Sequence, residues 1–389
     1  MRVLVTGAFG YVGHAVVRRL ATAGYEVVGL SRQGRVPHLA GVRTARADIL
    51  DARRLGQIVA EESPAAVCHL AALTRVRDSF REPLRYFEVN VQGTINLLSA
   101  LDAASTAHET PARLVFASTA AVYGAPERQP IHEDQPPAPT NPYGASKLAA
   151  DQVIGYQCGT GRLGAVSLRC FNVAGAVDGR GDTDETRIIP KALAVAAGRA
   201  PHLEVNGDGT AVREFVHVDD LAAAYVLALQ GCEPGRHQVF NVGSGTGVSV
   251  LDVIAAAEAV TGRPLAVLHR PPQPEPPVLL ADSSRIRDQL AWCPERSDIP
   301  RIIADAWGGY CDATSPRSHD NGSFVPDAHP ARRTGWTQMI HVGASEADVM
   351  ARAPTVSTSA GQMPQSAIWC SGTPCTAAYF STYHTVPEV

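Results

Sequence analysis

The chain has 389 residues, in which 34 lysines and arginines face 38 aspartates and glutamates, for a formal net charge of −4. This balance, without a basic run, argues against binding to nucleic acid or to an anionic membrane surface. No segment has the unbroken apolar length that spans a bilayer, and the N-terminus lacks the pattern of a secretory signal. We therefore expect a cytoplasmic protein with a small-molecule partner.

The eight cysteines are scattered, without a C-x-x-C pair, and the histidines do not cluster at ligand spacing. We expect reduced thiols and no metal site.

The first predicted element is a short apolar strand at residues 2–5, followed at once by a glycine-rich turn. Apolar residues then recur at helical spacing as far as Gly24, and residues 25–30 have the pattern of a second strand. A glycine turn at the first strand-to-helix crossover lets the backbone and the helix amides approach a dinucleotide pyrophosphate. The residues expected to meet the cofactor here are Gly7, Phe9, Gly10, Tyr11, Val12 and Gly13.

The residues at the end of the second strand do not decide between NAD and NADP as the cofactor. An enzyme that uses NAD usually places an acid here for the adenosine ribose, whereas this chain has Ser31 and Arg32. These two side chains are candidate cofactor contacts that could instead cradle the 2′-phosphate of NADP.

A tyrosine and a lysine lie one helical turn apart in the predicted helix that begins near residue 142. The chain has two lysines, and one of them, Lys147, follows Tyr143 by four residues. Side chains at this spacing share a helix face. A nearby ammonium stabilises a phenolate and lowers its pKa from about 10 toward the working range, so the pair suits proton transfer.

The G-x-x-G-x-x-G turn, taken with Tyr143 and Lys147, resembles the extended short-chain dehydrogenases/reductases, the NAD-dependent epimerase/dehydratase family. The resemblance implies an α/β fold, with a Rossmann-type doubly wound parallel sheet, a smaller α/β substrate-binding part and an irregular C-terminal extension. We expect residues 1–175 to be mainly dinucleotide-binding and residues 176–311 mainly substrate-binding, with interleaved segments. Residues 312–389 are rich in Ser, Thr, Pro, Gly and Ala and predict an extension of low order.

The same resemblance implies further contacts in the first half. The segment 113–124 is similar to the catalytic strand of the family, with Thr119 as the hydrogen-bonding hydroxyl and Ser118 as a supporting one. Thr119, Tyr143 and Lys147 would then be the catalytic residues. Tyr143 and Lys147 would also contact the cofactor, and further cofactor contacts are implied at Asp48, Ile49, Leu70, Ala71, Ala72, Asn90 and Phe171.

The second half resembles the UDP-glucose 4-epimerase branch of the family in its segments 168–176, 187–190, 212–222, 240–245 and 276–285. By that likeness Asn172 and Arg213 would bind the nucleotide diphosphate, and Arg270 and Glu275 retain fragments of another diphosphate-binding segment. Ser118, Thr119 and Tyr143 would contact the sugar. The dehydratase branch would carry Asp-Glu after the catalytic threonine, whereas Ala120 and Ala121 stand here, so elimination of water is disfavoured.

The resemblance thus implies a nucleotide-sugar 4-epimerase that uses NAD, with a homodimer formed through helices that begin near residues 91 and 146. An NADPH-dependent 4-ketoreductase of a nucleotide-activated deoxysugar is the alternative, favoured by Ser31 and Arg32 alone. A dinucleotide-sensing regulator has no need of the catalytic residues, and a steroid- or flavonoid-type dehydrogenase has no need of Asn172 and Arg213. His69 and His217 are expected to be framework residues.

Overall fold

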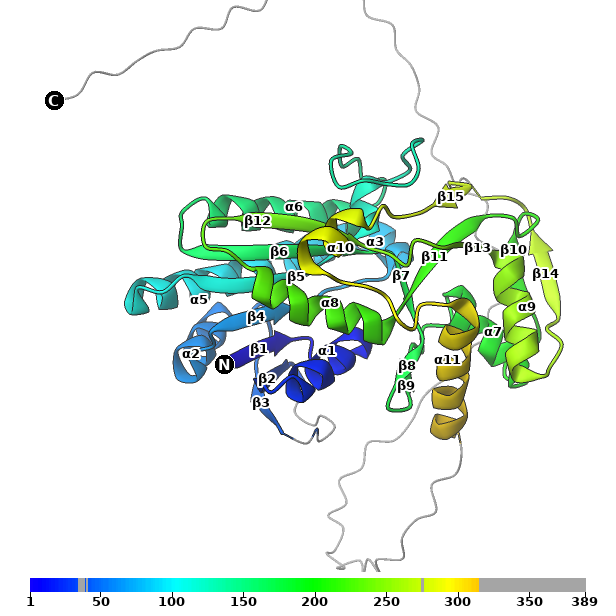
Figure 1. Ribbon diagram of the computed structural model, residues 1–389, viewed down its shortest axis with the longest axis horizontal. Coiled ribbons are helices and arrows are strands. Elements are labelled where there is room, and N and C mark those ends of the chain that lie inside the picture. Colours follow the sequence, from blue (N-terminus) through cyan, green and yellow to red (C-terminus); the bar gives the residue numbers. More distant parts are fainter. Residues whose placement is uncertain (34–38, 40, 274–275, 315–389) are drawn as a thin grey trace, which may run out of the picture. The chain divides into compact units, whose positions relative to one another are not determined.

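The computed structural model describes residues 1–33, 39, 41–273 and 276–314, which form a central parallel sheet with helices on both faces (Figure 1). Among these residues the sheet has seven strands, and all of its pairings are parallel. The spatial order is β12 (His237–Val242), β6 (Leu163–Cys170), β5 (Ala112–Thr119), β4 (Ala66–His69), β1 (Arg2–Thr6), β2 (Glu26–Ser31) and β3 (Val42–Arg46). The predicted doubly wound sheet is confirmed.

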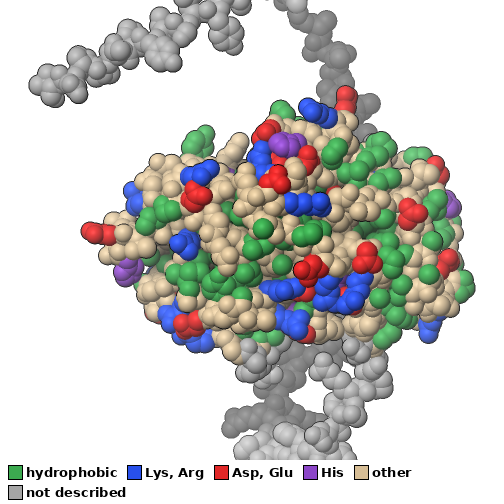
Figure 2. Space-filling model, in the orientation of Figure 1, with side chains coloured by type: hydrophobic (Ala, Val, Ile, Leu, Met, Phe, Trp, Pro, Cys, Tyr) green, Lys and Arg blue, Asp and Glu red, His purple; other side chains and the backbone are tan. Residues whose placement is uncertain are grey.

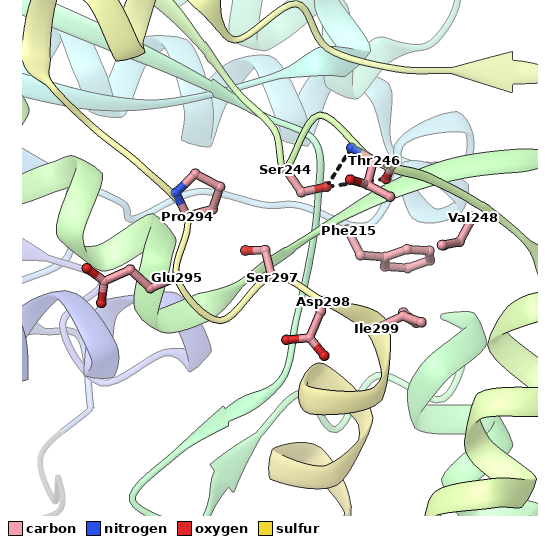
Figure 3. A pocket seen from close by; sticks show the side chains of 9 residues that line it. All are labelled: Phe215, Ser244, Thr246, Val248, Pro294, Glu295, Ser297, Asp298 and Ile299. Carbon is pink, nitrogen blue, oxygen red and sulfur yellow. Dashed lines mark hydrogen bonds between the residues drawn. The ribbon is translucent and has the colours of Figure 1, made fainter.

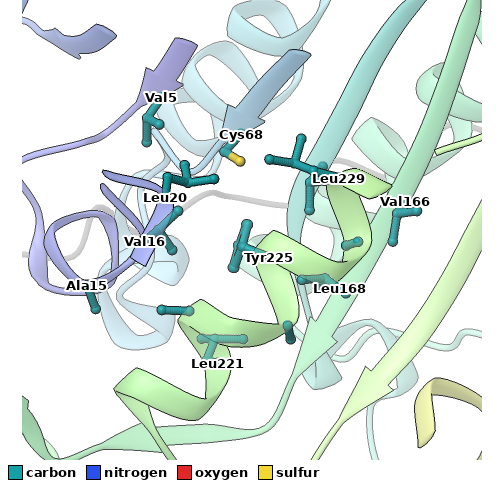
Figure 4. Close-up of a cluster of buried hydrophobic side chains, with 14 of the residues drawn as sticks. Val5, Ala15, Val16, Leu20, Cys68, Val166, Leu168, Leu221, Tyr225 and Leu229 are labelled. Carbon is teal, nitrogen blue, oxygen red and sulfur yellow. The ribbon is translucent and has the colours of Figure 1, made fainter. Parts of the chain in front are cut away.

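Each face of the sheet is buried under its own set of helices. On one face, α1 (Tyr11–Thr22) and α8 (Val218–Gly231) pack against each other and the sheet. Figure 4 shows this core, where Val16 and Leu20 of α1 approach Tyr225 of α8. The other face is covered by α2 (Ala52–Glu62), α5 (Gly93–His108) and α6 (Pro142–Cys158). Strands buried on both faces are apolar throughout, which explains the unbroken hydrophobic runs in the sequence.

The strand order reverses between β1 and β4. The chain proceeds outward from β1 to β2 and β3, then crosses back to β4 on the other side of β1. Because all strands are parallel, the loops after β1 and β4 diverge at the same edge, where such sheets bind their ligands. This edge is therefore where the site residues can converge.

The chain beyond β6 builds a second apolar cluster outside the central sheet. Its strands are β7 (Asn172–Ala174), β10 (Leu203–Asn206), β11 (Val212–His217), β13 (Gly247–Ser249), β14 (Val267–Arg270) and β15 (Val278–Leu279). Its helices are α7 (Ile188–Ala196), α9 (Val250–Thr261) and α11 (Ile299–Thr314). Between these segments β12 returns to pair with β6 in the central sheet.

The predicted division near residue 175 stays a prediction, and the extension beyond residue 314 lies outside the described residues. The smaller elements are β8 (Ala176–Val177), β9 (Arg180–Gly181), α3 (Val76–Arg81), α4 (Pro83–Phe87), α10 (Ser284–Leu290), a π-helix η1 (Glu88–Gln92) and a 3₁₀ turn η2 (Ala120–Tyr123). On the face drawn in Figure 2, basic and acidic side chains are interspersed.

A chain of buried hydrogen bonds begins at the carboxyl end of β1. Thr6 Oγ1 accepts the backbone amides of Leu70 and Ala71, both at 3.1 Å. With both lone pairs engaged, its proton is directed to His69 Nδ1 at 2.7 Å. His69 Nε2 therefore carries the ring proton and donates to Thr94 Oγ1 at 3.1 Å.

The same chain continues from α5 into α6. Thr94 donates to the carbonyl oxygen of Asn90 at 2.6 Å, and the Asn90 side-chain amide donates to Ser146 Oγ at 3.0 Å. Ser146 in turn donates to the carbonyl oxygen of Tyr143 at 2.8 Å. Asn90 also accepts from the amide of Leu73 and donates to its carbonyl, so its side chain is fully engaged. These bonds connect β1, β4, η1, α5 and the first turns of α6.

Acid should weaken the fold through His69, because its burial lowers the ring pKa to about 3. An unfolded histidine takes up a proton near pH 6.5, whereas His69 stays neutral in the folded state. Its contribution to the free energy of unfolding is therefore full above pH 6.5 and falls by about 1.4 kcal/mol per pH unit below it.

Urea unfolding between pH 7.5 and pH 5 measures this effect. His69→Gln should be less stable at pH 7.5 by roughly 2–3 kcal/mol, since it disrupts two buried hydrogen bonds, and should show a shallower pH dependence. His108→Gln, at an exposed position, is the control and should match the parent. Equal slopes for His69→Gln and the parent would show that His69 does not carry this proton.

Candidate active site

The turn between β1 and α1 forms a cradle that only glycine permits. A Cβ built on Gly13 would lie 2.0 Å from the carbonyl oxygen of Gly7, and one on Gly7 would lie 2.8 Å from the amide of Ala71. Gly7 also has a φ of +68°, a left-handed conformation that glycine adopts readily. The helix begins at Tyr11 with no side-chain cap, so its first amides remain for an anion such as a dinucleotide pyrophosphate.

The other predicted residues of this turn lie around the cradle. The ring of Phe9 lies 3.1 Å from a Cβ built on Gly29 of β2, so it packs over the next strand. Tyr11 donates its hydroxyl to the carbonyl oxygen of Gly175 at 2.9 Å, and Val12 packs against the core. Leu70 and Ala71 are held through their amides by Thr6, with Ala72 following them in the loop after β4.

The catalytic strand and helix meet at a close backbone approach. Asn141 caps α6 by accepting the amide of Gly144 at 2.8 Å, and Pro142 occupies the first turn, where its missing N–H costs nothing. A Cβ on Gly144 would lie 2.4 Å from the carbonyl oxygen of Ala121. This glycine brings Tyr143, the residue before it, against Thr119 at the end of β5. Thr119 is 8% exposed and accepts the amide of Ala121 at 3.2 Å.

The electrostatics of Tyr143 differ from the expectation drawn from the sequence. Burial raises the pKa of Tyr143 above its ordinary value, while its hydrogen bond with Thr119 and the charge of Arg187 act in the opposite direction. The expectation that Lys147 lowers this pKa is not met. The Lys147 ammonium instead lies over the Phe116 ring, 4.2 Å from its centroid, where a cation–π contact holds it.

Lys147 is 3% exposed, and this burial lowers its pKa to about 8, which Asp151 opposes as a nearby negative charge. Tyr143, Lys147 and Asp151 follow one another at four-residue intervals and so lie along one face of α6. An ammonium with a pKa this near neutrality can hold or release a proton under ordinary conditions.

Ser118 connects the end of β5 to helix α6 through a buried hydrogen bond. It is 2% exposed and donates its hydroxyl to Asp151 Oδ2 at 2.8 Å, while Arg169 lies 3.5 Å from the same oxygen. This bond agrees with the supporting hydroxyl expected at Ser118, while its contact with the sugar stays a prediction.

Three predicted cofactor contacts have side chains that are engaged elsewhere. Asn90 is 2% exposed, and its side-chain amide is hydrogen-bonded to the backbone of Leu73 and to Ser146. Ile49 packs where a Cβ on Gly93 would lie, and Phe171, 7% exposed, belongs to a separate apolar cluster. Asp48 is half-buried and accepts the amide of Leu50 at 3.0 Å.

The predicted substrate residues divide into two groups. β7 pairs in parallel with β11, which brings Asn172 beside the strand that carries Arg213. Asn172 donates to the carbonyl oxygen of Glu214 at 2.9 Å, and Arg213 donates to that of Val212 at 2.9 Å. Arg270 lies apart on β14.

Arg270 makes an exposed ion pair with Glu204 at 2.7 Å. The structure therefore gives this guanidinium a partner other than a substrate. Glu275 lies outside the described residues.

Two residues near the reacting group were missed by sequence reasoning. Asp151 could have been found from its spacing, four residues after Lys147. Arg187, at the N-terminal end of α7, has an ion pair with Asp182 at 2.8 Å and an electrostatic interaction with Tyr143. No spacing rule connects residue 187 to residue 143, since the chain between them crosses the sheet.

A separate hollow of about 330 Å³ opens beside β11 and the first turn of α11 (Figure 3). None of the predicted site residues lines it. Its walls are Phe215, Ser244, Thr246, Val248, Pro294, Glu295, Ser297, Asp298 and Ile299.

Two features are absent from the described part of the chain. No group of three or more His, Cys, Asp or Glu side chains among those residues is placed to hold a metal ion. No helix among them is long and apolar enough to cross a membrane.

The chain is similar in sequence to several UDP-glucose 4-epimerases. The relatives include a UDP-glucose 4-epimerase of Streptomyces lividans, 40% identical over 330 residues, which cover 82% of this chain and 98% of the relative. One from Corynebacterium glutamicum is 39% identical over 331 residues, with the same shares covered.

Solved structures show the same similarity. A UDP-glucose 4-epimerase from Stenotrophomonas maltophila, with bound NAD and formylated UDP-arabinopyranose, has a TM-score of 0.74 and 32% identity, covering 80% of this chain and 99% of that one. One from Brucella ovis in complex with NAD has a TM-score of 0.73 and 34% identity, covering 79% and 97%. A model of the NAD dependent epimerase/dehydratase family matches residues 3–243. The chain therefore belongs to the NAD-dependent epimerase/dehydratase family.

Proposed function

We infer that the protein is a nucleotide-sugar 4-epimerase that uses NAD and acts on a UDP-hexose of the glucose/galactose type. The observation that carries this inference is the position of Tyr143 and Thr119 at the carboxyl edge of the sheet, the edge that also carries the glycine cradle, in a chain that spans nearly the full length of UDP-glucose 4-epimerases. NAD is the cofactor found in the similar solved structures. The cradle formed by Gly7 and Gly13 fits its pyrophosphate.

Each chemical role can be assigned to a residue of this chain. NAD supplies the acceptor and donor of a hydride at C4 of the sugar. Tyr143 removes the proton of the 4-hydroxyl and later returns it, and Thr119, whose hydroxyl acts on the Tyr143 pKa, orients the reacting oxygen. The charge of Arg187 favours the phenolate form of Tyr143. Lys147 lies one helical turn from Tyr143, with its ammonium held over the Phe116 ring.

Epimerisation requires the sugar to present both faces while the nucleotide stays bound. Asn172 and Arg213 lie on adjacent strands, and a guanidinium suits phosphate oxygens, so these residues would anchor the diphosphate. A 4-ketoreductase is not favoured, because the relatives of nearly full length are epimerases and their solved counterparts contain NAD.

The surface beside α6 supports a homodimer. Phe80 of α3, Leu84 of α4 and Tyr156 of α6 are 61%, 83% and 83% exposed, which is unusual for large apolar side chains. The helices α3 and α4 pack against α6, so these residues flank the face formed by α5 and α6. We propose that a second copy of the chain covers this face.

Replacing the general base should abolish turnover without loss of the fold. Tyr143→Phe removes the hydroxyl that exchanges the proton, so kcat for interconversion of UDP-glucose and UDP-galactose should fall by about 10²–10⁴. Tyr25→Phe, at a half-buried position between α1 and β2 that belongs to neither the site nor the proposed dimer face, should leave kcat unchanged. Both variants should retain their bound dinucleotide. Full activity of Tyr143→Phe would contradict the assigned role.

The cofactor can be identified directly. Denaturing the purified protein should release NAD in nearly stoichiometric amount, measured by chromatography and mass spectrometry. Gly13→Ala should release little, because the added methyl would collide with the carbonyl of Gly7. The control is Gly56→Ala on α2, because the added methyl meets no neighbouring atom, and this variant should behave as the parent. Gly24→Ala would not serve, because Gly24 has a positive φ that alanine rarely adopts.

The dimer prediction is tested by the mass in solution. Light scattering after size exclusion should give twice the chain mass for the parent and a monomer for Leu84→Glu combined with Phe80→Glu. Leu251→Glu, at an exposed apolar position on α9, is the control and should remain dimeric. A monomeric parent at micromolar concentration would refute the proposed interface.

A further inference from the structure

We propose that the adenosine end of the crevice carries a binding site for a ribose 2′-phosphate, formed by Ser31, Arg32 and Arg46, so that the protein binds NADP(H) in competition with NAD. This inference rests on the dinucleotide site of the proposed function. It concerns which cofactor the crevice admits and does not change the reaction assigned to Tyr143.

The end of β2 lies next to the glycine turn. β1 and β2 are paired with Thr6 opposite Leu30, so the two strands reach the same edge. A Cβ on Gly29 would lie 3.0 Å from Ala8 Cβ and 3.1 Å from the Phe9 ring, which shows that this face of β2 touches the turn. Ser31 is two residues further on the same face, just beyond Phe9. A dinucleotide with its pyrophosphate on the turn places its adenosine ribose here.

The register of the sheet adds a second arginine. β2 and β3 are parallel, with Ser31 opposite Arg46, and side chains of paired residues emerge on the same face. Arg32 follows Ser31 directly, and Arg32 and Arg46 are both exposed. Ser31, Arg32 and Arg46 therefore all stand at the carboxyl end of β2 and β3.

The charges around this point favour a phosphate over a bare hydroxyl. No aspartate or glutamate occurs between residues 27 and 47, so the stretch offers no carboxylate to a 2′-hydroxyl and none to repel a phosphate. The hydroxyl of Ser31 accepts the amide of Gln33 at 3.0 Å and keeps its proton for a ligand oxygen.

The arginines of this region differ in whether they have a carboxylate partner. Arg43 is committed to Glu26 and Glu62, at 2.9 and 2.7 Å. Arg32 and Arg46 make no ion pair with any residue in the described ranges. Guanidinium groups form charge-assisted, often bidentate bonds with phosphate, whereas a ribose hydroxyl gains little from them.

The consequence for the enzyme is a second occupant of the crevice. Epimerisation begins with oxidation at C4, which needs an oxidised nicotinamide. NADPH held by this site would block the crevice until it is exchanged, so the two cofactor pools of the cell would compete for the protein.

The test is the composition of bound dinucleotide. The purified protein is equilibrated with equal concentrations of NAD⁺ and NADP⁺ until exchange is complete, then separated from free ligand and denatured, and the released NADP⁺/NAD⁺ ratio is measured by mass spectrometry. The parent should release both. Arg32→Ala and Arg46→Ala should each lower the ratio by about tenfold, since each removes one charge-assisted contact.

Two further variants make the result specific. Ser31→Asp, which places a carboxylate where NAD enzymes carry one, should lower the ratio further while total occupancy is retained. Arg53→Ala, an exposed arginine on α2, is the control and should match the parent. A parent that releases NAD⁺ alone, or a ratio unchanged by both arginine variants, would overturn the 2′-phosphate site and leave the epimerase intact. Release of no dinucleotide would overturn both proposals.

Discussion

The direction of one buried proton orders the hydrogen bonds around the catalytic helix. Because the oxygen of Thr6 already accepts two amides, its hydrogen has a single destination, and the tautomer of His69 follows from that. Every later donor in the series is then fixed as far as the carbonyl of Tyr143. Buried networks of this kind stabilise one arrangement when all their members are satisfied. Reversing any member would leave a buried group unpaired.

This constraint fixes the position of the glycine turn relative to helix α6. The same threonine that begins the series also holds the loop after β4 against the glycine turn. The far end of the series reaches the helix that presents the phenol. The cofactor cradle and the proton-transfer group are thus connected through the protein interior, independently of any ligand between them. The cation–π contact of Lys147 with Phe116, whose ring also lies 5.8 Å from that of His69, adds the ammonium to the same framework.

The sequence was informative where chemistry and local geometry coincide. The glycine spacing, the Tyr143 and Lys147 pair and the hydrophobic runs predicted the sheet, its family and the edge that carries the site. Roles that depend on which way a side chain points could not be obtained in this way. Ser118 is adjacent to Thr119, yet alternation along a strand sends the two hydroxyls to opposite sides. Arg187 approaches Tyr143 only through the tertiary fold. The pKa of Tyr143 required knowledge of burial, which outweighs the charge expected from helix spacing.

The return of β12 to the central sheet joins a late segment of the chain to strands formed much earlier. Since β12 covers the outer edge of β6, a fragment that stopped after β6 would expose a long, apolar strand edge to solvent. Such a fragment would be prone to self-association, so the chain cannot be cut or recombined directly after β6 without exposing this edge. During synthesis on the ribosome, the sheet can close only after more than sixty further residues have emerged.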